Sequence, residues 1–306
     1  MKIEPLKEVW LKEYVAMFNA SLPKEFETTQ NIFREKVWNS PDFYEKASKA
    51  IIDEHNMPVG FLVIKKSQHP EVDGKIAWIS AFFIKKDNRK NGYATQLFQQ
   101  AERTLKDEGI EKIFVGQEYD NFFSGIPAPS EESATFFKKM GFWLNDSDHY
   151  DLEADVQKIT TIDSFDVSKY ETEFFTDELH ADEKQEVLTF LEKEFPGRWH
   201  YEVKTYLEEE KPLSHIVVLR KKDTLAIKGF CMLSVAKDKR GGLGPIGIGK
   251  DVRGKTVGNY ILCKSMQQLR KLGGETTCID WTLLKSFYGQ FEFAPVRTYL
   301  GSCKNI

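Results

Sequence analysis

The spacing of apolar residues predicts a helix between two strands in the first half of the chain. Five apolar residues recur every three or four positions within 92–108, which places them on one helix face: Ala94, Leu97, Phe98, Ala101 and Leu105. Residues 75–85 (KIAWISAFFIK) and 112–117 (KIFVGQ) are short runs rich in β-branched and aromatic residues, which is typical of buried strands. The order strand, turn, helix, strand predicts a helix packed against a sheet.

The same order of elements occurs again in the second half. The first series has a strand over 75–85, a turn over 86–91, a helix over 92–108, a strand over 112–117 and a helix over 131–140. The second series has a strand over 243–250, a turn over 251–255, a helix over 257–272, a strand over 276–281 and a helix over 284–291. Helical segments and a pair of strands precede each series, so the repeat predicts two similar domains.

We therefore expect an α+β fold class with α/β/α layers. Each domain is expected to hold a mixed, mostly antiparallel sheet flanked by helices. The polar stretch from Asn145 to Asp148 follows the first series, and we place the boundary shortly after it. The sequence thus predicts an N-terminal domain over residues 1–157 and a C-terminal domain over residues 158–306.

Charge and composition exclude several classes of protein. Lys and Arg number 43 against 47 Asp and Glu, a net charge of −4, so no overall basic field attracts nucleic acid or an anionic membrane. No apolar run approaches the roughly 18 residues that a membrane span needs. We expect a cytoplasmic protein with no nucleic-acid partner and no membrane partner, and the sequence leaves its oligomeric state open.

Cysteine and histidine do not have the spacing of a metal site. The four cysteines contain no CxxC pair, so neither a zinc site nor a disulfide framework is indicated. His149, His180, His200 and His215 show no metal-ligand spacing with one another or with the cysteines. We expect no metal.

The turn before the first long helix has the chemistry that binds phosphate. Residues 89–94 read Arg-Lys-Asn-Gly-Tyr-Ala. A helix that begins after such a turn points free backbone N–H groups and a positive dipole end at an anion. Gly92 lets a phosphate approach the backbone, and Arg89 and Lys90 add local positive charge. An ordinary basic turn is the alternative, but the order strand, turn, helix favours a diphosphate site.

With Arg89, Gly92 and Ala94 in place, this turn resembles the coenzyme loop of the GNAT-superfamily N-acetyltransferases, which follows Arg/Gln-x-x-Gly-x-Gly/Ala. The second series resembles the same domain, so the whole chain resembles a tandem GNAT protein. The resemblance implies acetyl-CoA as cosubstrate, with its diphosphate bound by Arg89, Lys90, Asn91, Gly92, Tyr93 and Ala94. It also implies that the pantetheine arm pairs with the main chain of Phe82, Phe83 and Ile84, for which Ile246 to Ile248 are the second-half equivalents.

The second-half loop departs from the family pattern. Residues 253–258 read RGKTVG, with Thr256 where the middle Gly belongs. A β-branched residue there occupies the place where a diphosphate would approach, so we expect an altered coenzyme loop. Residues 249–256 also satisfy G-x-x-x-x-G-K-[ST], the P-loop of nucleotide triphosphatases. Only about 50 residues follow, too few for the further βα units of such a domain, and the repeat pairs this loop with that of Arg89.

Acetyl transfer by direct attack of an amine on the thioester needs a neutral amine and an acid for the departing thiolate. In many GNAT enzymes the acid is a tyrosine of the last helix. Tyr288 in FYGQFEF has that place, whereas Phe137 has it in the first half. Glu118 and Tyr119, just after the strand over 112–117, are the first half's candidate acid/base groups. The alternatives are solvated loop residues at both positions and a half-buried core aromatic at Tyr288.

The loop over residues 122–127 (FFSGIP) is either a substrate lid or a packed surface loop. The resemblance favours an acetyl-CoA-dependent N-acetyltransferase, whose first half holds the coenzyme and whose acceptor is a primary amine of a small molecule or peptide. The alternatives are a non-catalytic acyl-CoA-binding or scaffold protein, and catalysis in the second half through Tyr288. The acceptor, the catalytic half and coenzyme binding by the second half stay open.

Overall fold

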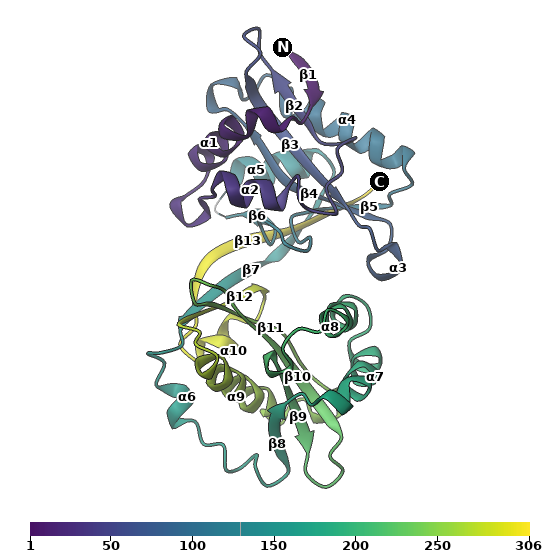
Figure 1. Ribbon diagram of the computed structural model, residues 1–306. Coiled ribbons are helices and arrows are strands. Elements are labelled where there is room, and N and C mark those ends of the chain that lie inside the picture. The colour runs from purple at the N-terminus through teal and green to yellow at the C-terminus, as the bar shows by residue number, and fades with distance from the viewer. Residues whose placement is uncertain (129) are drawn as a thin grey trace. The chain divides into compact units, whose positions relative to one another are not determined.

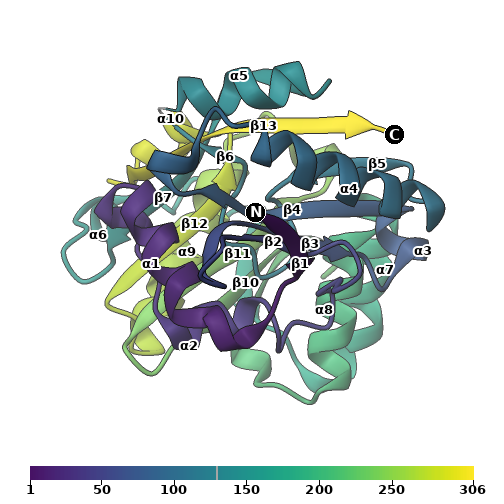
Figure 2. The ribbon, with the colours of Figure 1, turned by 90° about the horizontal axis from the view of Figure 1, so that it is seen from above.

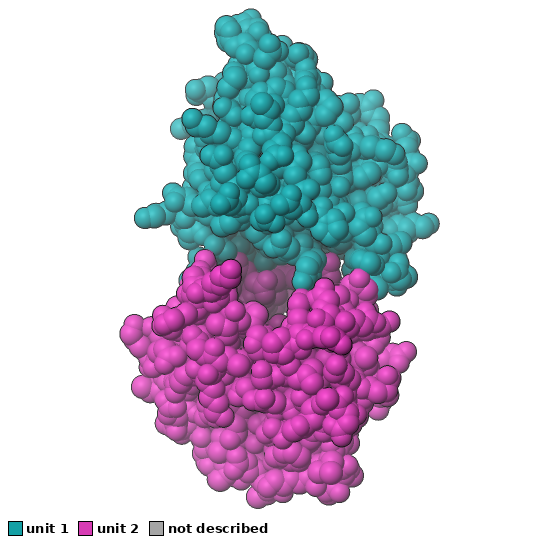
Figure 3. Space-filling model, viewed as in Figure 1, with its two compact units in different colours: residues 1–150, 296–306 teal, residues 151–295 magenta. Residues whose placement is uncertain are grey.

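The computed structural model describes residues 1–128 and 130–306, which form two compact units (Figure 3). Unit 1 comprises Met1–Tyr150 and Val296–Ile306, and unit 2 comprises Asp151–Pro295. The sequence placed one boundary, after residue 157, whereas the structure has two, each inside a long strand. The second exists because the last strand of the chain pairs within unit 1, a non-local pairing that its own residues do not reveal.

Unit 1 is built on a mixed sheet (Figure 1). Its strands, in spatial order, are β1 (Lys2–Pro5), β2 (Lys49–Ile52), β3 (Pro58–Lys66), β4 (Ile76–Ile84), β5 (Lys112–Val115), β13 (Ala294–Asn305) and β7 (Trp143–Asp155), with β6 (Ile126–Pro127) on β13. Strands β1 to β4 pair antiparallel, β4 and β5 pair parallel, and β13 pairs antiparallel with β5 and β6. The expected mixed sheet is confirmed.

Helices cover both faces of this sheet (Figure 2). Those of unit 1 are α1 (Leu11–Ser21), α2 (Gln30–Lys36), α3 (Pro70–Asp73), α4 (Tyr93–Asp107) and α5 (Glu131–Lys139), with short 3₁₀ turns η1 (Glu8–Trp10), η2 (Lys24–Phe26) and η3 (Lys86–Asn88). One core lies beneath α1 and α2 and contains Tyr14, Phe18 and Phe33. The other lies beneath α4 and α5, where the predicted apolar face of α4 is buried.

A β-bulge at Ser80 changes the course of β4. Val63 pairs with Ala81 and Ile64 with Ile79, so Ser80 is an extra residue in β4. Because side chains alternate along a strand, the extra residue reverses the faces. Ile79 packs in the core beneath α4, whereas Ala81, two positions on, packs in the core beneath α1 and α2.

Unit 2 has the same kind of sheet. Its strands, continuing from β7, are β12 (Thr276–Thr282), β11 (Arg240–Ile248), β10 (Ile227–Val235), β9 (Ile216–Lys221) and β8 (Phe174–Glu178). Its helices are α6 (Thr161–Ser164), α7 (Lys184–Glu194), α8 (Arg198–Glu208), α9 (Val257–Lys271) and α10 (Lys285–Gly289), with turns η4 (Ala181–Glu183), η5 (Leu213–His215) and η6 (Lys250–Val252). Strands β8 to β11 pair antiparallel and β11 pairs parallel with β12.

The two units correspond position by position around their central helices. Ile76 pairs with Lys112 between β4 and β5, and Arg240 pairs with Thr276 between β11 and β12, so unit 2 numbers are 164 higher. The same offset relates the bounds of α4 to those of α9. The sequence repeat is therefore a structural repeat.

None of the helices in residues 1–128 and 130–306 is long and apolar enough to cross a membrane. Within those residues there is also no group of three or more His, Cys, Asp or Glu side chains arranged to hold a metal ion.

Candidate active site

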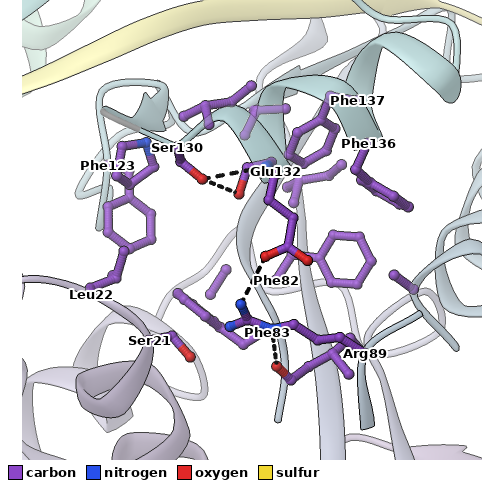
Figure 4. A pocket seen from close by; sticks show the side chains of 18 of the residues that line it. Ser21, Leu22, Phe82, Phe83, Arg89, Phe123, Ser130, Glu132, Phe136 and Phe137 are labelled. Atoms are coloured by element: carbon purple, nitrogen blue, oxygen red, sulfur yellow. Dashed lines mark hydrogen bonds and ion pairs between the residues drawn. The ribbon is translucent and has the colours of Figure 1, made fainter. Parts of the chain in front are cut away.

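A cavity of about 520 Å³ opens in unit 1 where β4 and β5 separate (Figure 4). The two strands pair from Ile76–Lys112 to Ile79–Val115, and then β5 ends. The cavity is lined by β4 residues 79–84, by the start of α4, by α5, and by residues 125–128 around β6. The turn that follows α1 also contributes, with Leu22, Pro23 and Phe26.

The separation leaves one edge of β4 available to a ligand. On its other edge, β4 pairs with β3, with Leu62 opposite Phe82 and Gly60 opposite Ile84. Backbone groups that face away from β3 in this stretch have lost β5 as a partner and border the cavity. An extended ligand with amide groups could pair there as an additional strand does. Phe82, Phe83 and Ile84 all line the cavity, and their binding of a pantetheine arm stays a prediction.

The start of α4 borders the same cavity. Gly92 is its N-cap in the left-handed conformation (φ 79°), and no side chain within the described part of the chain caps the helix there. The first N–H groups of a helix have no intrahelical acceptor, so those of α4 are available to an anion. A Cβ on Gly92 would meet only the Gln96 side chain, at 3.8 Å. The space over the turn is therefore open.

Arg89 borders the cavity but is held by its neighbours. Its Nη1 donates to Glu132 Oε2 of α5 at 2.9 Å and its Nε donates to the carbonyl oxygen of Ile84 at 3.1 Å (Figure 4). Its charge is thus partly balanced before any ligand binds. Lys90 lines the cavity too, whereas Asn91 lies outside the lining and donates from Nδ2 to the Asn88 carbonyl at 3.2 Å.

Aromatic side chains form the apolar part of the cavity. Phe82 of β4 meets Phe136 and Phe137 of α5 edge to face, with ring centroids 5.5 and 6.4 Å apart. Phe137, which has the place of the family's tyrosine, is buried and also packs on Phe142. This position of unit 1 therefore contributes no proton donor.

Glu118 lies behind the cavity rather than in its lining. Its side chain is buried and its Oε1 accepts a hydrogen bond from the Ser80 hydroxyl, and Ser80 itself lines the cavity. Lys65 of β3 is also fully buried, with its Nζ 3.7 Å from Glu118 Oε1. The structure thus joins one predicted residue to two that the sequence analysis did not select.

The other two acid/base candidates lie elsewhere. Tyr119 is 62% exposed and is not among the lining residues of the described cavity. Tyr288 belongs to α10 of unit 2, where it packs against Phe287 and Phe293. Burial raises the pKa of its hydroxyl. These two residues are not brought to the unit 1 cavity lining.

The loop over residues 122–127 is packed into unit 1. Phe123 is buried and stacks on Phe18 at 5.3 Å, and its carbonyl accepts the Gln117 N–H. Ile126 and Pro127 form β6 and pair with β13. These contacts favour the packed interpretation of the loop, and a role as a lid stays a prediction.

The loop with the P-loop pattern has the fold of its repeat partner. Both loops consist of a 3₁₀ turn followed by a long helix, and Arg253 Nε donates to Ile248 O at 3.2 Å as Arg89 does to Ile84. The residue pattern is therefore not accompanied by the P-loop domain's architecture.

Sequence reasoning missed Ser80, Lys65 and Glu132. A signal existed for two of them, because Ser80 and Lys65 are polar positions within strongly apolar strands. Glu132 had none, since its importance comes from Arg89, which lies 43 residues away.

Comparisons with known proteins identify the fold that contains this arrangement of a splayed parallel strand pair beside an open helix start. Residues 6–142 match the Acetyltransferase (GNAT) family. None of the curated proteins matches the chain by sequence.

Solved structures extend the likeness to the whole chain. The glucosamine N-acetyltransferase region of a fungal multi-domain GH3 β-N-acetylglucosaminidase, which is GCN5-related, superposes with a TM-score of 0.86 at 19% identity, over 99% of this chain and 38% of that one. A GCN5-related N-acetyltransferase from Sphaerobacter thermophilus gives 0.74 at 11% identity, over 99% and 95%. A tandem GNAT protein from the clavulanic acid biosynthesis pathway gives 0.64 at 11% identity, over 99% and 98%.

The likeness to the Acetyltransferase (GNAT) family thus covers residues 6–142, and the solved structures show that the GNAT fold occurs twice in the chain. The chain spans only 38% of the length of the fungal protein.

Proposed function

We propose that the protein is an acetyl-CoA-dependent N-acetyltransferase, with a single coenzyme site in unit 1 and a primary amine as acceptor. The observation that carries the proposal is that one cavity is bordered by an open helix start and by a stretch of β4 that has no strand partner on that side. The first suits the amide groups of a pantetheine arm and the second suits a diphosphate.

The residues present fit acetyl-CoA. The N–H groups at the start of α4 would hold the diphosphate, with Lys90 adding positive charge. The main chain of Phe82, Phe83 and Ile84 would hold the pantetheine arm. Acetyl-CoA supplies an activated acetyl thioester. The aromatic group of Phe82, Phe136 and Phe137 keeps water from this part of the cavity.

The test is calorimetric titration of the full chain with acetyl-CoA, using two glycine variants. Gly92→Val puts a branched side chain over the open helix start, so acetyl-CoA affinity should fall at least about tenfold. Gly109→Val is the matched control, because Gly109 also has a positive φ (73°) and open space at its Cβ but lies past the other end of α4. The proposal is wrong if both variants bind equally well or if the wild-type chain does not bind.

The acceptor is tested by measuring thiol release from acetyl-CoA with amines of several classes. Glucosamine is the first probe, because the fungal neighbour is described as a glucosamine N-acetyltransferase region. Binding of acetyl-CoA without turnover across amino sugars, polyamines and peptides would favour the non-catalytic acyl-CoA-binding alternative. The cytoplasmic location and the absence of a nucleic-acid partner stay predictions.

A further inference from the structure

We propose that one end of the unit 1 cavity binds the apolar body of the acceptor, so that the acceptor is a primary amine on an apolar or aromatic body without a second positive charge. This apolar end is formed by Leu22, Pro23 and Phe26 of the turn after α1, and by Phe123 and Gly125 of the loop after β5. The inference rests on the proposed function and names the class of acceptor that its site takes.

The two ends of the cavity differ in chemistry. The coenzyme end contains the open start of α4 and the ion pair of Arg89 with Glu132. In Figure 4, Leu22 and Phe123 lie across the cavity from Arg89. The ends also belong to different cores, because Phe26 and Phe123 are part of the core beneath α1 and α2, whereas α4 and α5 cover the other one.

The course of β4 relates the apolar end to the reaction. Strand β4 runs toward the turn before α4. A ligand with its diphosphate at α4 and its amide groups along Phe82 to Ile84 therefore extends back toward Ala81. Ala81 packs in the same core as Phe26 and Phe123. The reactive tip of such a ligand, and the amine that attacks it, thus lie next to the apolar end.

Among the described lining residues, the apolar end has no carboxylate for a second cation. The charged residues of the described lining are Arg89, Lys90, Glu132 and Lys139, and they belong to the turn before α4 or to α5. Glu132 is already paired with Arg89 at 2.9 Å. Moving an ammonium group out of water without a carboxylate partner is costly, so a second positive charge disfavours binding at this end.

A cation already lies against Phe26. The guanidinium group of Arg297 is 5.5 Å from the centre of the Phe26 ring, and its Nε donates to the carbonyl oxygen of Glu25 at 2.8 Å. The Glu25 side chain is exposed and is not among the described lining residues. The charge of Arg297 therefore adds to the cost of placing a second ammonium group beside Phe26.

Two buried aromatic rings give this end a fixed wall. Phe123 stacks on Phe18 with the ring centroids 5.3 Å apart. Phe26 lies 6.0 Å from Phe123 and meets Tyr299 edge to face at 5.8 Å. Rings that pack on several neighbours keep one orientation, so an apolar group binds to them with little loss of side-chain entropy.

The rim of the apolar end has apolar surface that a ligand can cover. Leu22 is half-buried and Pro23 is exposed, and both line the cavity. The neighbouring Ser21 adds a hydroxyl rather than a charge, and this hydroxyl donates to the Met17 carbonyl oxygen at 2.7 Å. Each CH₂ group of a ligand that is buried on this rim should raise affinity about three- to fourfold.

The first test compares two amines of equal length that differ by one charge. Thiol release from saturating acetyl-CoA is measured with hexylamine and with hexane-1,6-diamine. The kcat/KM for hexylamine should be at least about tenfold higher, and it should rise from propylamine to hexylamine. Equal or better use of the diamine overturns the inference, and so does a kcat/KM for glucosamine above that for hexylamine.

The second test adds a carboxylate to the apolar end. Leu22→Asp should reduce the preference for hexylamine over the diamine at least about tenfold, because the new carboxylate pairs with the second ammonium group. Leu22→Asn has the same size without the charge, and it should weaken use of hexylamine without improving use of the diamine. If the folded Asp variant keeps the wild-type preference, the apolar end does not bind the acceptor.

A second position keeps this test available if Leu22→Asp does not fold. Pro23 is exposed and is the N-cap of η2, a position that Asp favours, so Pro23→Asp should fold and should reduce the preference in the same direction. Val9→Asp is the control for added charge, because Val9 is 78% exposed and lies outside the described lining. Its preference should stay within about twofold of wild type, since a distant surface charge is screened. A shift as large as that of Leu22→Asp would overturn the assignment.

The third test measures binding without turnover. The full chain is saturated with CoA, which has no acetyl group to transfer, and hexylamine is titrated by calorimetry. Hexylamine should bind equally to wild type and Val9→Asp and more weakly to Leu22→Asn, and equal affinity for all three proteins overturns the inference.

The outcomes separate this inference from the proposed function. If neither CoA nor acetyl-CoA binds, the proposed function is wrong, and the hexylamine titration is made on the free chain with the same variants. If acetyl-CoA binds and its acetyl group passes to the diamine or to glucosamine while hexylamine does not bind, the proposed function stands and only the apolar class of acceptor is wrong.

Discussion

The loops before α4 and α9 have the same backbone conformation but different surroundings. Gly92 and Thr256 are both left-handed N-caps of fifteen-residue helices, with φ of 79° and 57°. Over Gly92 the space is open to the cavity, whereas the Thr256 hydroxyl lies 2.7 Å from the hydroxyl of Tyr170. Tyr170 is buried and stacks on Tyr260 of α9 at 5.4 Å. Repetition of a fold thus preserves backbone geometry without preserving a binding surface.

Thr256 also carries a conformational cost that Gly92 does not. A β-branched residue in the left-handed region is strained by about 1–2 kcal/mol. The Tyr170 hydrogen bond and the aromatic stack around it offset part of that strain. Unit 2 therefore stabilises its loop internally, while unit 1 leaves its loop open for a ligand.

The largest effect is expected from exchanging the two residues. Gly92→Thr gives unit 1 the residue of unit 2, and the added side chain over the open helix start should lower acetyl-CoA affinity about tenfold or more. Calorimetry on the full chain measures this. The reciprocal Thr256→Gly should keep the stoichiometry at one site per chain, and a second site would show that Thr256 alone separates the two units.

A smaller effect is expected from removing the hydroxyl contact in unit 2. Tyr170→Phe keeps the ring stack but deletes the bond to Thr256, so the free energy of unfolding should fall by about 1 kcal/mol. Urea unfolding measures the change. Acetyl-CoA affinity should be the same as in wild type, and a loss of affinity would mean that unit 2 takes part in coenzyme binding.

A change of a few fold in acetyl-CoA affinity is expected when Glu132, the partner of Arg89, is substituted. Glu132→Gln removes a carboxylate that borders the cavity and frees the Arg89 guanidinium for an anion. Acetyl-CoA affinity should rise about two- to fivefold at low salt and less at high salt, because the pair is partly exposed. Glu131→Gln removes a carboxylate from the same helix turn at a residue that is not among those lining the described cavity, so it is the control, and equal affinity in all three proteins would contradict the role of Glu132.

The smallest effect is expected at Tyr288. If unit 1 alone performs the transfer, Tyr288→Phe should leave kcat within about twofold of the wild-type value. A larger loss is expected only when the hydroxyl that is removed donates a proton in the reacting site. Acetylation of glucosamine measures this. A large fall in kcat with unchanged stability would restore the alternative in which unit 2 is catalytic.

Local signals predicted α4 and its loop well. The apolar period fixed the helix to within one residue at each end, because amphipathic spacing and a turn glycine are both short-range features. The strand β4 was predicted equally closely. Its bulge was not, since β4 is apolar on both faces and an extra residue leaves no break in the pattern.

The site depended on contacts that no local pattern contains. Glu118 was selected because it follows a strand, but Lys65 and Ser80 meet it only through the pairing of β3, β4 and β5. The same limit applies to Arg89 and Glu132. The pairing of strand β13 within unit 1 was missed for a related reason, because an alternating strand does not indicate which sheet it will enter.

Strand β13 affects the order in which the two units can complete their folding during synthesis. Its residues Val296–Ile306 complete the sheet of unit 1 beside β5, although they are synthesised after all of unit 2. Unit 2 is one continuous stretch, Asp151–Pro295, and can close its sheet as soon as that stretch has left the ribosome. Unit 1 must wait with a gap beside β5, so the half of the chain that is translated first is the half that finishes folding last.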